Sequence, residues 1–379
     1  MRCVGATLRG SPRPLAQRHD VALLDLDGVV YVGPDAVPGV PAALAQARRF
    51  GMRLAFVTNN ASRSPAAVAQ HLGELGVEAR PDEVVTSAQA AARFLAGRLP
   101  PGAPVLVVGT AALADALRER GLDPVWQAHA GDDLVRAIVQ GYSPDTTWRM
   151  LAEGAVAIER GALWVATNAD PTVPSPRGPL PGNGSLVAAL RHATGADPIV
   201  TGKPDPAMHR ETVLRTAAEN PVVVGDRLDT DIEGANAVGC PSLLVFSGVT
   251  RPIEVLSAPA RLRPTYLAAD ARGLLQAHLE PRQTSDGAVC GRWLARRTEA
   301  AWELSVTAAG GMADASPVAS GSNDDARRDD DLDALRALCA ARWARFGNEA
   351  DSGSARLTAA QGDDEALLTL TNLGLGGAG

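Results

Sequence analysis

The chain has 379 residues, of which 46% are hydrophobic and 21% charged, a composition ordinary for a globular protein of about two to three domains. Its net charge of −7 argues against a surface for nucleic acid or an anionic membrane, so an anionic substrate requires a metal ion or a placed cation. No apolar run reaches the roughly 18 residues that a membrane span requires.

The N-terminal segment, residues 1–18, carries arginines but no apolar stretch, so we expect a poorly ordered leader rather than a signal peptide. From about residue 20 to residue 270, short apolar runs alternate with alanine-rich segments. The runs predict buried strands within 21–28, 52–60, 221–226 and 242–248. The segments between them predict helices, such as one at 65–75 with Ser64 as its N-cap. This alternation indicates a Rossmann-like parallel sheet covered by helices on both faces.

The middle of the chain repeats this pattern. Apolar runs within 104–110, 133–141 and 161–168 predict three more strands, and 146–161 predicts a helix. We therefore expect an α/β cap domain inserted into the α/β core. The expected boundaries are 19–87 and 185–275 for the core and 88–184 for the cap.

After residue 275 the pattern changes, and residues 276–379 are expected to form a small α+β extension. Within it, 287–309 predicts a β-hairpin and 331–346 an amphipathic helix. The segment 309–331 is of low complexity and is expected to be mobile. A strand at 355–360 and a helix at 363–374 are expected to follow.

The tightest group of chemically useful residues is the pair Asp25 and Asp27 in DLDGVV, at the end of the first predicted strand. An Asx-turn would explain one aspartate but not two. A calcium loop would need further oxygen ligands at alternate positions and a preceding helix, whereas Val29, Tyr31 and a strand stand there. The pair suits phosphoryl transfer, in which one aspartate attacks phosphorus and a second acid handles the proton.

Three partners for such a site also follow predicted strands. Thr58 ends one strand in FVTNN, and Asp226 follows another in VVVGDRLDTDI, with Asp231 shortly after it. The third partner, Lys203 in TGKPDP, is the only lysine of the chain. It does not belong to a phosphate-binding GxxxxGK[ST] loop, because Gly195 is two residues too far back and Pro204 follows. Strand-end turns and helix N-termini also favour such residues, so each partner is a weaker signal than the aspartate pair.

In this order, the motifs around Asp25, Thr58, Lys203 and Asp226 resemble the four motifs of the haloacid dehalogenase superfamily, phosphatase branch. TNADPTVP, PGNGSLVAAL and GDRLDTDIEGANAVG are typical of its NagD/4-nitrophenylphosphatase/phosphoglycolate phosphatase class. The similarity covers about residues 19–275. It is strongest to the actinobacterial glycerol-3-phosphate phosphatases, through VTNNASRS, GALWVATNADPT and VVGDRLDTDIEGANA.

The resemblance implies a role for each acid of the site. Asp25 would be the nucleophile and Asp27 the general acid and base. The carboxylate of Asp25, the backbone carbonyl of Asp27 and the side chain of Asp226 would hold Mg²⁺. Asp231 would lie behind them, on metal-bound waters or on Lys203.

The resemblance also implies how the phosphoryl group is held. Thr58 and the backbone amides of Asn59 and Asn60 would grip it, and Lys203 would neutralise Asp25 and the phosphate oxygens. We name Asn168, Asp170 and Arg227 as candidates that contact the rest of the substrate. Trp164 is expected in the core of the cap rather than as a stacking platform for a ligand.

The resemblance predicts a Mg²⁺-dependent phosphatase acting through an aspartyl-phosphate, with glycerol 3-phosphate as the expected substrate. Phosphoglycolate, sugar phosphates and nucleoside monophosphates are the alternative substrates. A different alternative is a regulator that binds a phosphometabolite without turnover. Four scattered cysteines without a CxxC pair favour a reduced, cytoplasmic setting. A homodimer is the expected assembly, with neither nucleic acid nor membrane as a partner.

The extension at 276–379 departs from the minimal pattern of the family. The related enzymes' extensions resemble part of an acetyltransferase fold, but no motif for acetyl-CoA is visible here. We therefore expect no transferase activity. The extension is interpreted either as a module that aids dimerisation or senses a metabolite, or as a degenerate appendage.

Overall fold

The computed structural model describes residues 7–128, 135–173, 177–299, 301–307, 323–347 and 356–376. The chain divides into two compact units. The first unit comprises Met1–Val32, Ala36–Leu54 and Glu219–Gly379, and the second comprises Gly33–Asp35 and Ala55–Ala218. Within the described residues, no helix combines the length and the apolar character needed to cross a membrane.

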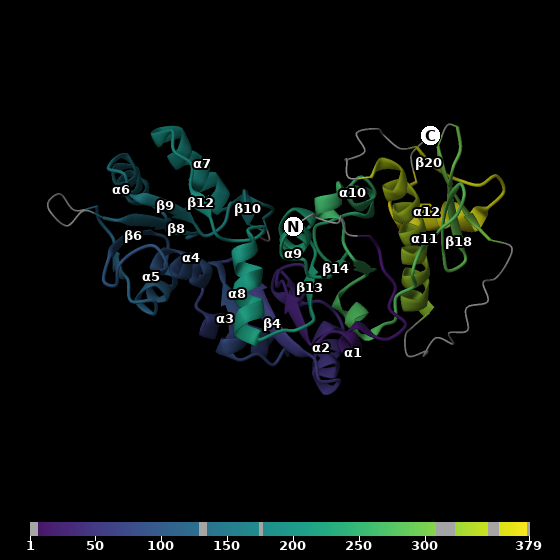
Figure 1. The fold of residues 1–379 in the computed structure, drawn as a ribbon, viewed down its shortest axis with the longest axis horizontal. Helices are drawn as coiled ribbons and strands as arrows, with labels where there is room; N and C mark the ends of the chain where they lie inside the picture. The colour runs from purple at the N-terminus through teal and green to yellow at the C-terminus, as the bar shows by residue number, and fades with distance from the viewer. Residues whose placement is uncertain are drawn as a thin grey trace. The chain divides into compact units, whose positions relative to one another are not determined.

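The first unit contains four strands of a parallel sheet, in the order β15-β14-β13-β1, of which β13 and β14 are labelled in Figure 1. They are β1 (Val21–Leu24), β13 (Pro221–Gly225), β14 (Ser242–Val245) and β15 (Tyr266–Ala268). Every residue of these strands is buried, which explains their continuous apolar sequences. Helices α2 (Val40–Arg49), α9 (Glu233–Val238) and α10 (Pro252–Leu256) belong to the same unit. The predicted parallel α/β core is confirmed.

The expectation of a poorly ordered leader is wrong for residues 7–18. Their backbone pairs with the first unit: Arg9 N–H donates to Thr265 O at 3.0 Å, and Ser11 forms an antiparallel bridge with His278. Helix α1 (Leu15–Arg18) buries Leu15 completely. These partners lie more than 200 positions away in the chain, so local composition could not reveal them. Residues 1–6 lie outside the described residues.

The second unit contains two parallel sheet segments. In one, β4 (Arg53–Thr58) pairs with β5 (Val84–Thr86). The other is a five-stranded sheet in the order β12-β9-β8-β6-β7. Its strands are β6 (Pro104–Val108), β7 (Asp123–Val125), β8 (Ala137–Gln140), β9 (Leu163–Ala166) and β12 (Ile199–Val200). This second sheet is the inserted α/β cap that the sequence predicts.

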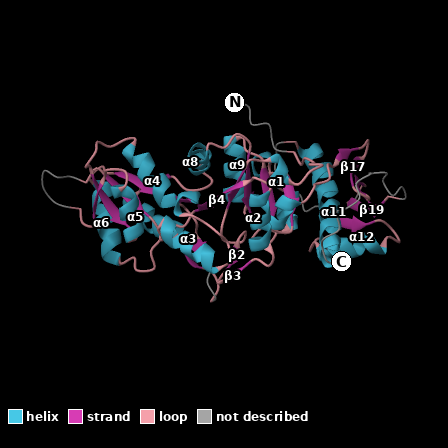
Figure 2. Cartoon of the chain, turned by 90° about the horizontal axis from the view of Figure 1, so that it is seen from below, coloured by secondary structure: helices cyan, strands magenta, loops and turns pink. Residues whose placement is uncertain are grey.

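Helices cover the strands of the second unit (Figure 2). They are α3 (Pro65–Glu74), α4 (Ser87–Ala96), α5 (Ala111–Arg118), α6 (Trp148–Glu159), α7 (Asn183–Thr194) and α8 (Pro206–Thr216). The Ser64 hydroxyl accepts a hydrogen bond from Ala67 N–H at 3.2 Å, which confirms the predicted N-cap of α3. Because β12 pairs with β9, the cap sheet continues to Val200, past the expected boundary at residue 184.

The C-terminal part of the first unit carries a separate sheet in the order β16-β17-β18-β19-β20. Its strands are β16 (Arg282–Gln283), β17 (Gly287–Cys290), β18 (Trp293–Arg297), β19 (Trp302–Val306) and β20 (Leu357–Ala359). Strands β17, β18 and β19 form an antiparallel meander, so the expectation of one hairpin there was too small. The extra strand arises because β18 pairs with β17 along one edge and with β19 along the other. Helices α11 (Asn323–Phe346) and α12 (Asp364–Asn372) complete the extension.

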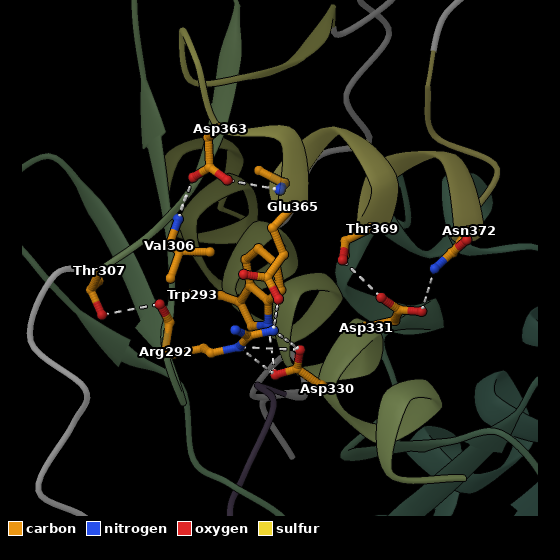
Figure 3. A network of polar contacts seen from close by, with 11 residues as sticks. Arg292, Trp293, Val306, Thr307, Asp330, Asp331, Asp363, Glu365, Thr369 and Asn372 are labelled. Carbon is orange, nitrogen blue, oxygen red and sulfur yellow. Dashed lines mark hydrogen bonds and ion pairs between the residues drawn. The ribbon is translucent and has the colours of Figure 1, made fainter. Parts of the chain in front are cut away.

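The expected mobile segment 309–331 is wrong for its last part, because α11 already begins at Asn323. The start of this helix is tied to β18: Asp330 accepts hydrogen bonds from the Arg292 guanidinium and from Trp293 Nε1 (Figure 3). Asp331 accepts others from Thr369 and Asn372 of α12. These contacts order an acidic stretch that its composition alone marks as unfolded. Residues 308–322 lie outside the described residues.

Candidate functional site

Three carboxylates meet at one edge of the parallel sheet of the first unit. Asp25 directly follows β1, and Asp226 directly follows β13, the strand that pairs with β1. Asp231 lies in the turn that comes next, Leu228–Ile232. One oxygen atom from each of these three side chains lies within 4.8 Å of the other two. Asp226 and Asp231 are each 1% exposed, and Asp25 is half-buried.

Backbone amides hold two of these carboxylates in place. Asp226 Oδ2 accepts a hydrogen bond from Val249 N–H at 2.7 Å. Asp231 Oδ2 accepts one from Arg227 N–H at 3.1 Å. These hydrogen bonds orient the side chains of Asp226 and Asp231 toward the cluster.

Two glycines make room for the Asp226 carboxylate because they have no side chain. A Cβ atom on Gly248 would lie 1.9 Å from Asp226 Oδ2, and one on Gly28 would lie 2.5 Å from the same atom. Gly28 also has a φ angle of +83°, which side chains rarely adopt. Gly28 belongs to the DLDG motif, whereas Gly248 was not singled out by the sequence analysis. Ligands bind at the carboxyl ends of parallel strands, and Gly248 follows β14 at that edge of the sheet. Its position could therefore have marked it as part of the site.

The donor set of this cluster fits a hard divalent cation. Mg²⁺ prefers oxygen ligands from one or two carboxylates, with the remaining positions filled by water and substrate phosphate. Two buried carboxylates beside a third also need a positive charge nearby, because burial in a low dielectric strengthens their repulsion. The three side chains lie close enough together to bind one such cation directly or through a water molecule.

Asp27 lies outside this cluster and is exposed. Its Oδ2 accepts a weak hydrogen bond from the Tyr31 hydroxyl at 3.4 Å, and the Asp27–Tyr31 turn is closed by Gly28 N–H donating to Tyr31 O at 2.8 Å. Its exposure leaves it accessible to solvent, as a group that exchanges protons must be. Arg227 turns to Asp229, with a guanidinium–carboxylate distance of 2.8 Å.

The candidate phosphate-binding residues gather in the second unit, at the carboxyl end of β4. Thr58 is buried, and its Oγ1 accepts a hydrogen bond from Asn60 N–H at 3.1 Å. The hydroxyl hydrogen of Thr58 remains available to a phosphate oxygen, whereas the Asn60 amide is already used. Asn60 Oδ1 accepts from Ser62 N–H at 2.9 Å and so shapes the loop itself.

Lys203 lies in the same unit, in the loop after β12. Its side chain is 3% exposed, and Nζ donates to the backbone carbonyl of Val57 at 3.2 Å. That carbonyl belongs to the residue before Thr58. The structure therefore brings the only lysine of the chain to the strand end that carries the candidate phosphate-binding threonine.

The two cap candidates, Asn168 and Asp170, both contact Asn59, which in turn contacts the backbone of Lys203. Asn168 is 3% exposed, and its Nδ2 donates to Asn59 O at 2.8 Å while its Oδ1 accepts from Asp170 N–H at 3.1 Å. Both ends of this amide are occupied by backbone groups. Asp170 accepts from Asn59 Nδ2 at 3.1 Å. Trp164 is buried in the cap core, as predicted, with Nε1 donating to Gln140 Oε1 at 3.2 Å.

Two family descriptions match the chain. Residues 22–123 match the family described as haloacid dehalogenase-like hydrolase, and residues 200–274 match one described as HAD-hydrolase-like. The two matches contain Asp25, Asp27 and Thr58 in the first segment and Lys203 and Asp226 in the second.

Similarity to individual proteins extends over most of the chain. It is 46% identical to the D-glycerol 3-phosphate phosphatase of Mycobacterium tuberculosis over 359 residues, which are 94% of this chain and 95% of that protein. A crystal structure of glycerol phosphate phosphatase from the same organism in complex with magnesium matches with a TM-score of 0.81 and 44% identity, covering 96% of this chain and 99% of the other. An acid sugar phosphatase of Staphylococcus saprophyticus is 33% identical over 69% of this chain and 98% of its own length.

Proposed function

Because the chain belongs to the haloacid dehalogenase-like hydrolase family, we propose that it hydrolyses D-glycerol 3-phosphate to glycerol and phosphate with a bound Mg²⁺ ion. The observation that carries the proposal is the group of three carboxylates, Asp25, Asp226 and Asp231, within 4.8 Å of one another. The phosphatase relative that spans 94% of the chain supports the choice of substrate. The chain is accordingly a phosphoric monoester hydrolase.

Asp25 is the proposed nucleophile. One of its carboxylate oxygens attacks phosphorus, the bond from phosphorus to the ester oxygen breaks, and an aspartyl-phosphate remains. Bound Mg²⁺ supplies the positive charge that offsets repulsion between the phosphate and these acids. Asp226 and Asp231, held by the amides of Val249 and Arg227, are the proposed ligands that keep this charge beside Asp25, with the backbone carbonyl of Asp27 as a further ligand.

Asp27 is the proposed general acid and base. As a carboxylic acid it gives its proton to the departing alkoxide of glycerol. As a carboxylate it then takes a proton from the water that attacks phosphorus, which releases phosphate and restores Asp25. Its exposed position supports this role, because the water must reach it.

Thr58 and Lys203 are proposed to bind the phosphoryl group, with the Thr58 hydroxyl as a hydrogen-bond donor and the Lys203 ammonium as a cation. The backbone amide of Asn59 is a further proposed donor. Asn60, Asn168, Asp170 and Arg227 remain further candidates for contact with substrate, and each of them also contacts a neighbouring residue.

The proposal is tested by phosphate release from glycerol 3-phosphate, phosphoglycolate, a sugar phosphate, a nucleoside monophosphate and 4-nitrophenyl phosphate, with and without Mg²⁺. We expect the highest kcat/KM for glycerol 3-phosphate, and turnover that requires Mg²⁺ and disappears in Asp25→Asn. Asp115→Asn is the matched control, since Asp115 is an exposed acid on α5 that pairs with Arg118. A higher kcat/KM for the sugar phosphate would reject glycerol 3-phosphate as the preferred substrate. Binding of an ester without turnover of any would favour the regulator instead.

We also propose a cytoplasmic setting and a homodimer. The described cysteines Cys240, Cys290 and Cys339 are all free thiols, which supports a reducing compartment. Burial raises the pKa of Cys240 to about 11, so this thiol stays protonated and unreactive near neutral pH. The mass of the native protein by light scattering tests the dimer.

A further inference from the structure

The side chain of Asn59 makes an unusual set of contacts with the backbone of Lys203. Asn59 Oδ1 accepts a hydrogen bond from Lys203 N–H at 2.9 Å. Asn59 Nδ2 donates to the carbonyl oxygen of the same residue at 3.3 Å. The amide thus pairs with both backbone groups of Lys203, as a neighbouring β-strand would, across 144 positions of sequence.

The second side-chain hydrogen and the backbone carbonyl of Asn59 also have partners. The second hydrogen of Nδ2 goes to Asp170 Oδ2 at 3.1 Å. The backbone carbonyl of Asn59 accepts from Ser87 Oγ at 2.6 Å and from Asn168 Nδ2 at 2.8 Å. Asn59 directly follows β4 and is fixed by hydrogen bonds from Ser87 at the start of α4 and from Asn168 of the cap. Its own hydrogen bonds in turn fix the backbone of Lys203.

Only an amide satisfies these partners. The backbone N–H of Lys203 requires an acceptor, while the Lys203 carbonyl and the Asp170 carboxylate require donors. An aspartate would place its second carboxylate oxygen against two other acceptors. Gly202 fits the same arrangement, because a Cβ atom there would lie 2.7 Å from Asn59 Oδ1 and 2.2 Å from Thr167 O.

We propose that the Asn59 side chain is a positioning residue that clamps the backbone of Lys203 and so sets where the lysine ammonium meets the phosphoryl group. This role is separate from that of the Asn59 backbone amide. The predicted effect on turnover rests on the proposed phosphatase function. The hydrogen bonds between Asn59 and Lys203 do not, because both residues belong to the second unit. Asp170 completes the clamp by occupying the remaining hydrogen of the amide.

The first test is Asn59→Asp, which changes one NH₂ group into an oxygen atom. We expect kcat to fall on the order of 100-fold, because a displaced catalytic group loses that much without leaving the site. KM should change far less than kcat. The double variant Asn59→Asp with Asp170→Asn restores one donor–acceptor pair, and we expect it to recover roughly tenfold of the lost kcat.

The matched control is Asn236→Asp. Asn236 Nδ2 also donates to two backbone carbonyls, those of Arg261 at 2.8 Å and Arg263 at 3.1 Å. The chemical change is the same, and Asn236 is not among the site residues. We expect its kcat to equal that of the unaltered enzyme. A kcat of Asn59→Asp within about twofold of the unaltered value, in a folded protein, would overturn the proposal.

A second measurement needs neither turnover nor a variant that folds. Since Lys203 is the only lysine, protein labelled with ¹⁵N-lysine gives a single backbone amide signal for it. We expect this amide to be strongly protected from hydrogen exchange in the unaltered protein, because it is hydrogen-bonded to Asn59 and buried. Rapid exchange would reject the clamp. Protection together with no phosphatase turnover would retain the clamp and reject the proposed function.

Discussion

At the scale of single residues, the surroundings of Lys203 explain why a chain that otherwise uses arginine keeps one lysine here. The side chain is 3% exposed and reaches the carbonyl of Val57 at 3.2 Å. A guanidinium is wider and planar, and it presents its hydrogen atoms in a fixed fork. No arginine can replace a compact ammonium in so enclosed a place without moving its neighbours.

We therefore predict that Lys203→Arg lowers kcat on the order of 100-fold while the protein stays folded, because the charge is kept but misplaced. Steady-state kinetics on glycerol 3-phosphate, beside a circular dichroism spectrum, measures this. Arg49→Lys, the reverse exchange at an exposed position of α2, serves as the control and should leave kcat unchanged. Near-normal turnover in Lys203→Arg would show that the site needs only a positive charge.

Sequence could identify residues whose place follows from the strand before them, but not residues whose role depends on a partner far away in the chain. Asp25 and Asp226 were predictable as neighbours, because each follows an apolar strand and parallel strands end at the same edge of a sheet. The side-chain role of Asn59 was not predictable, because its partner in the chain is 144 positions away. The backbone contacts of the Asn168 amide with Asn59 and Asp170 were likewise not predictable, because they depend on the path of loops far apart in the chain.

At the scale of elements, Asp330 in the first half of α11 joins this helix to β18. Asp330 accepts hydrogen bonds from Arg292 Nε at 3.1 Å and from Trp293 Nε1 at 3.0 Å, and Trp293 is fully buried. Glu365 of α12 contacts the same arginine (Figure 3). The composition of 309–331 marked this stretch as mobile, because a run of acids is unfolded unless partners elsewhere neutralise it.

We predict that Asp330→Ala lowers the free energy of unfolding by about 2 kcal/mol, because it leaves the buried indole N–H of Trp293 without an acceptor. Asp330→Asn keeps an acceptor for Trp293 and loses only the charge beside the partly exposed Arg292, so it should cost less than half as much. Urea denaturation of both variants measures the difference. Equal losses in the two would mean that the ion pair, and not the indole, holds the helix.

His278 joins three elements of the first unit. Its backbone bridges to Ser11, its Nε2 lies 2.9 Å from Gly273 O, and Arg336 Nη2 of α11 lies 3.4 Å from its Nδ1. These partners require the neutral tautomer with hydrogen on Nε2. Burial, together with the positive charge of Arg336, lowers the pKa of His278 to about 3. The neighbouring ring is that of Tyr266, and Asp333 pairs with Arg336.

This pKa predicts how stability depends on pH. The unfolded chain binds the proton near the ordinary pKa of about 6.5 and the folded chain does not, so stability is full above that pH and falls as the pH decreases toward 3. At about pH 5 the loss from this group is about 2 kcal/mol. His278→Gln should flatten the pH dependence of the unfolding free energy between pH 7 and pH 5, roughly by that amount. An unchanged pH dependence in His278→Gln would show that His278 does not cause the loss of stability between pH 7 and pH 5.

At the scale of the whole molecule, the extension is continuous with the core of the first unit. One hydrophobic cluster contains Leu244 and Leu267 of the parallel sheet together with Trp293, Leu335 and Leu338 of the extension. Trp343 Nε1 donates to Val255 O at 3.2 Å, so α11 is also bonded to the backbone of α10. The extension therefore packs against the core of the first unit, and its interpretation as a sensing or dimerisation module or as a degenerate appendage stays open.

We predict that a chain ending at residue 275 is strongly destabilised, because the removal uncovers the apolar surface of β15 and α10 that α11 now covers. The midpoint of thermal unfolding should fall by about 10 °C or more, or the protein should aggregate on size-exclusion chromatography. Trp343→Phe is the graded control: it keeps an aromatic ring but loses the hydrogen bond to Val255, so it should cost about 1 kcal/mol. A monomeric truncated chain with an unchanged midpoint would mean that the extension folds separately, and that its contacts with the sheet contribute nothing to the stability of the enzyme.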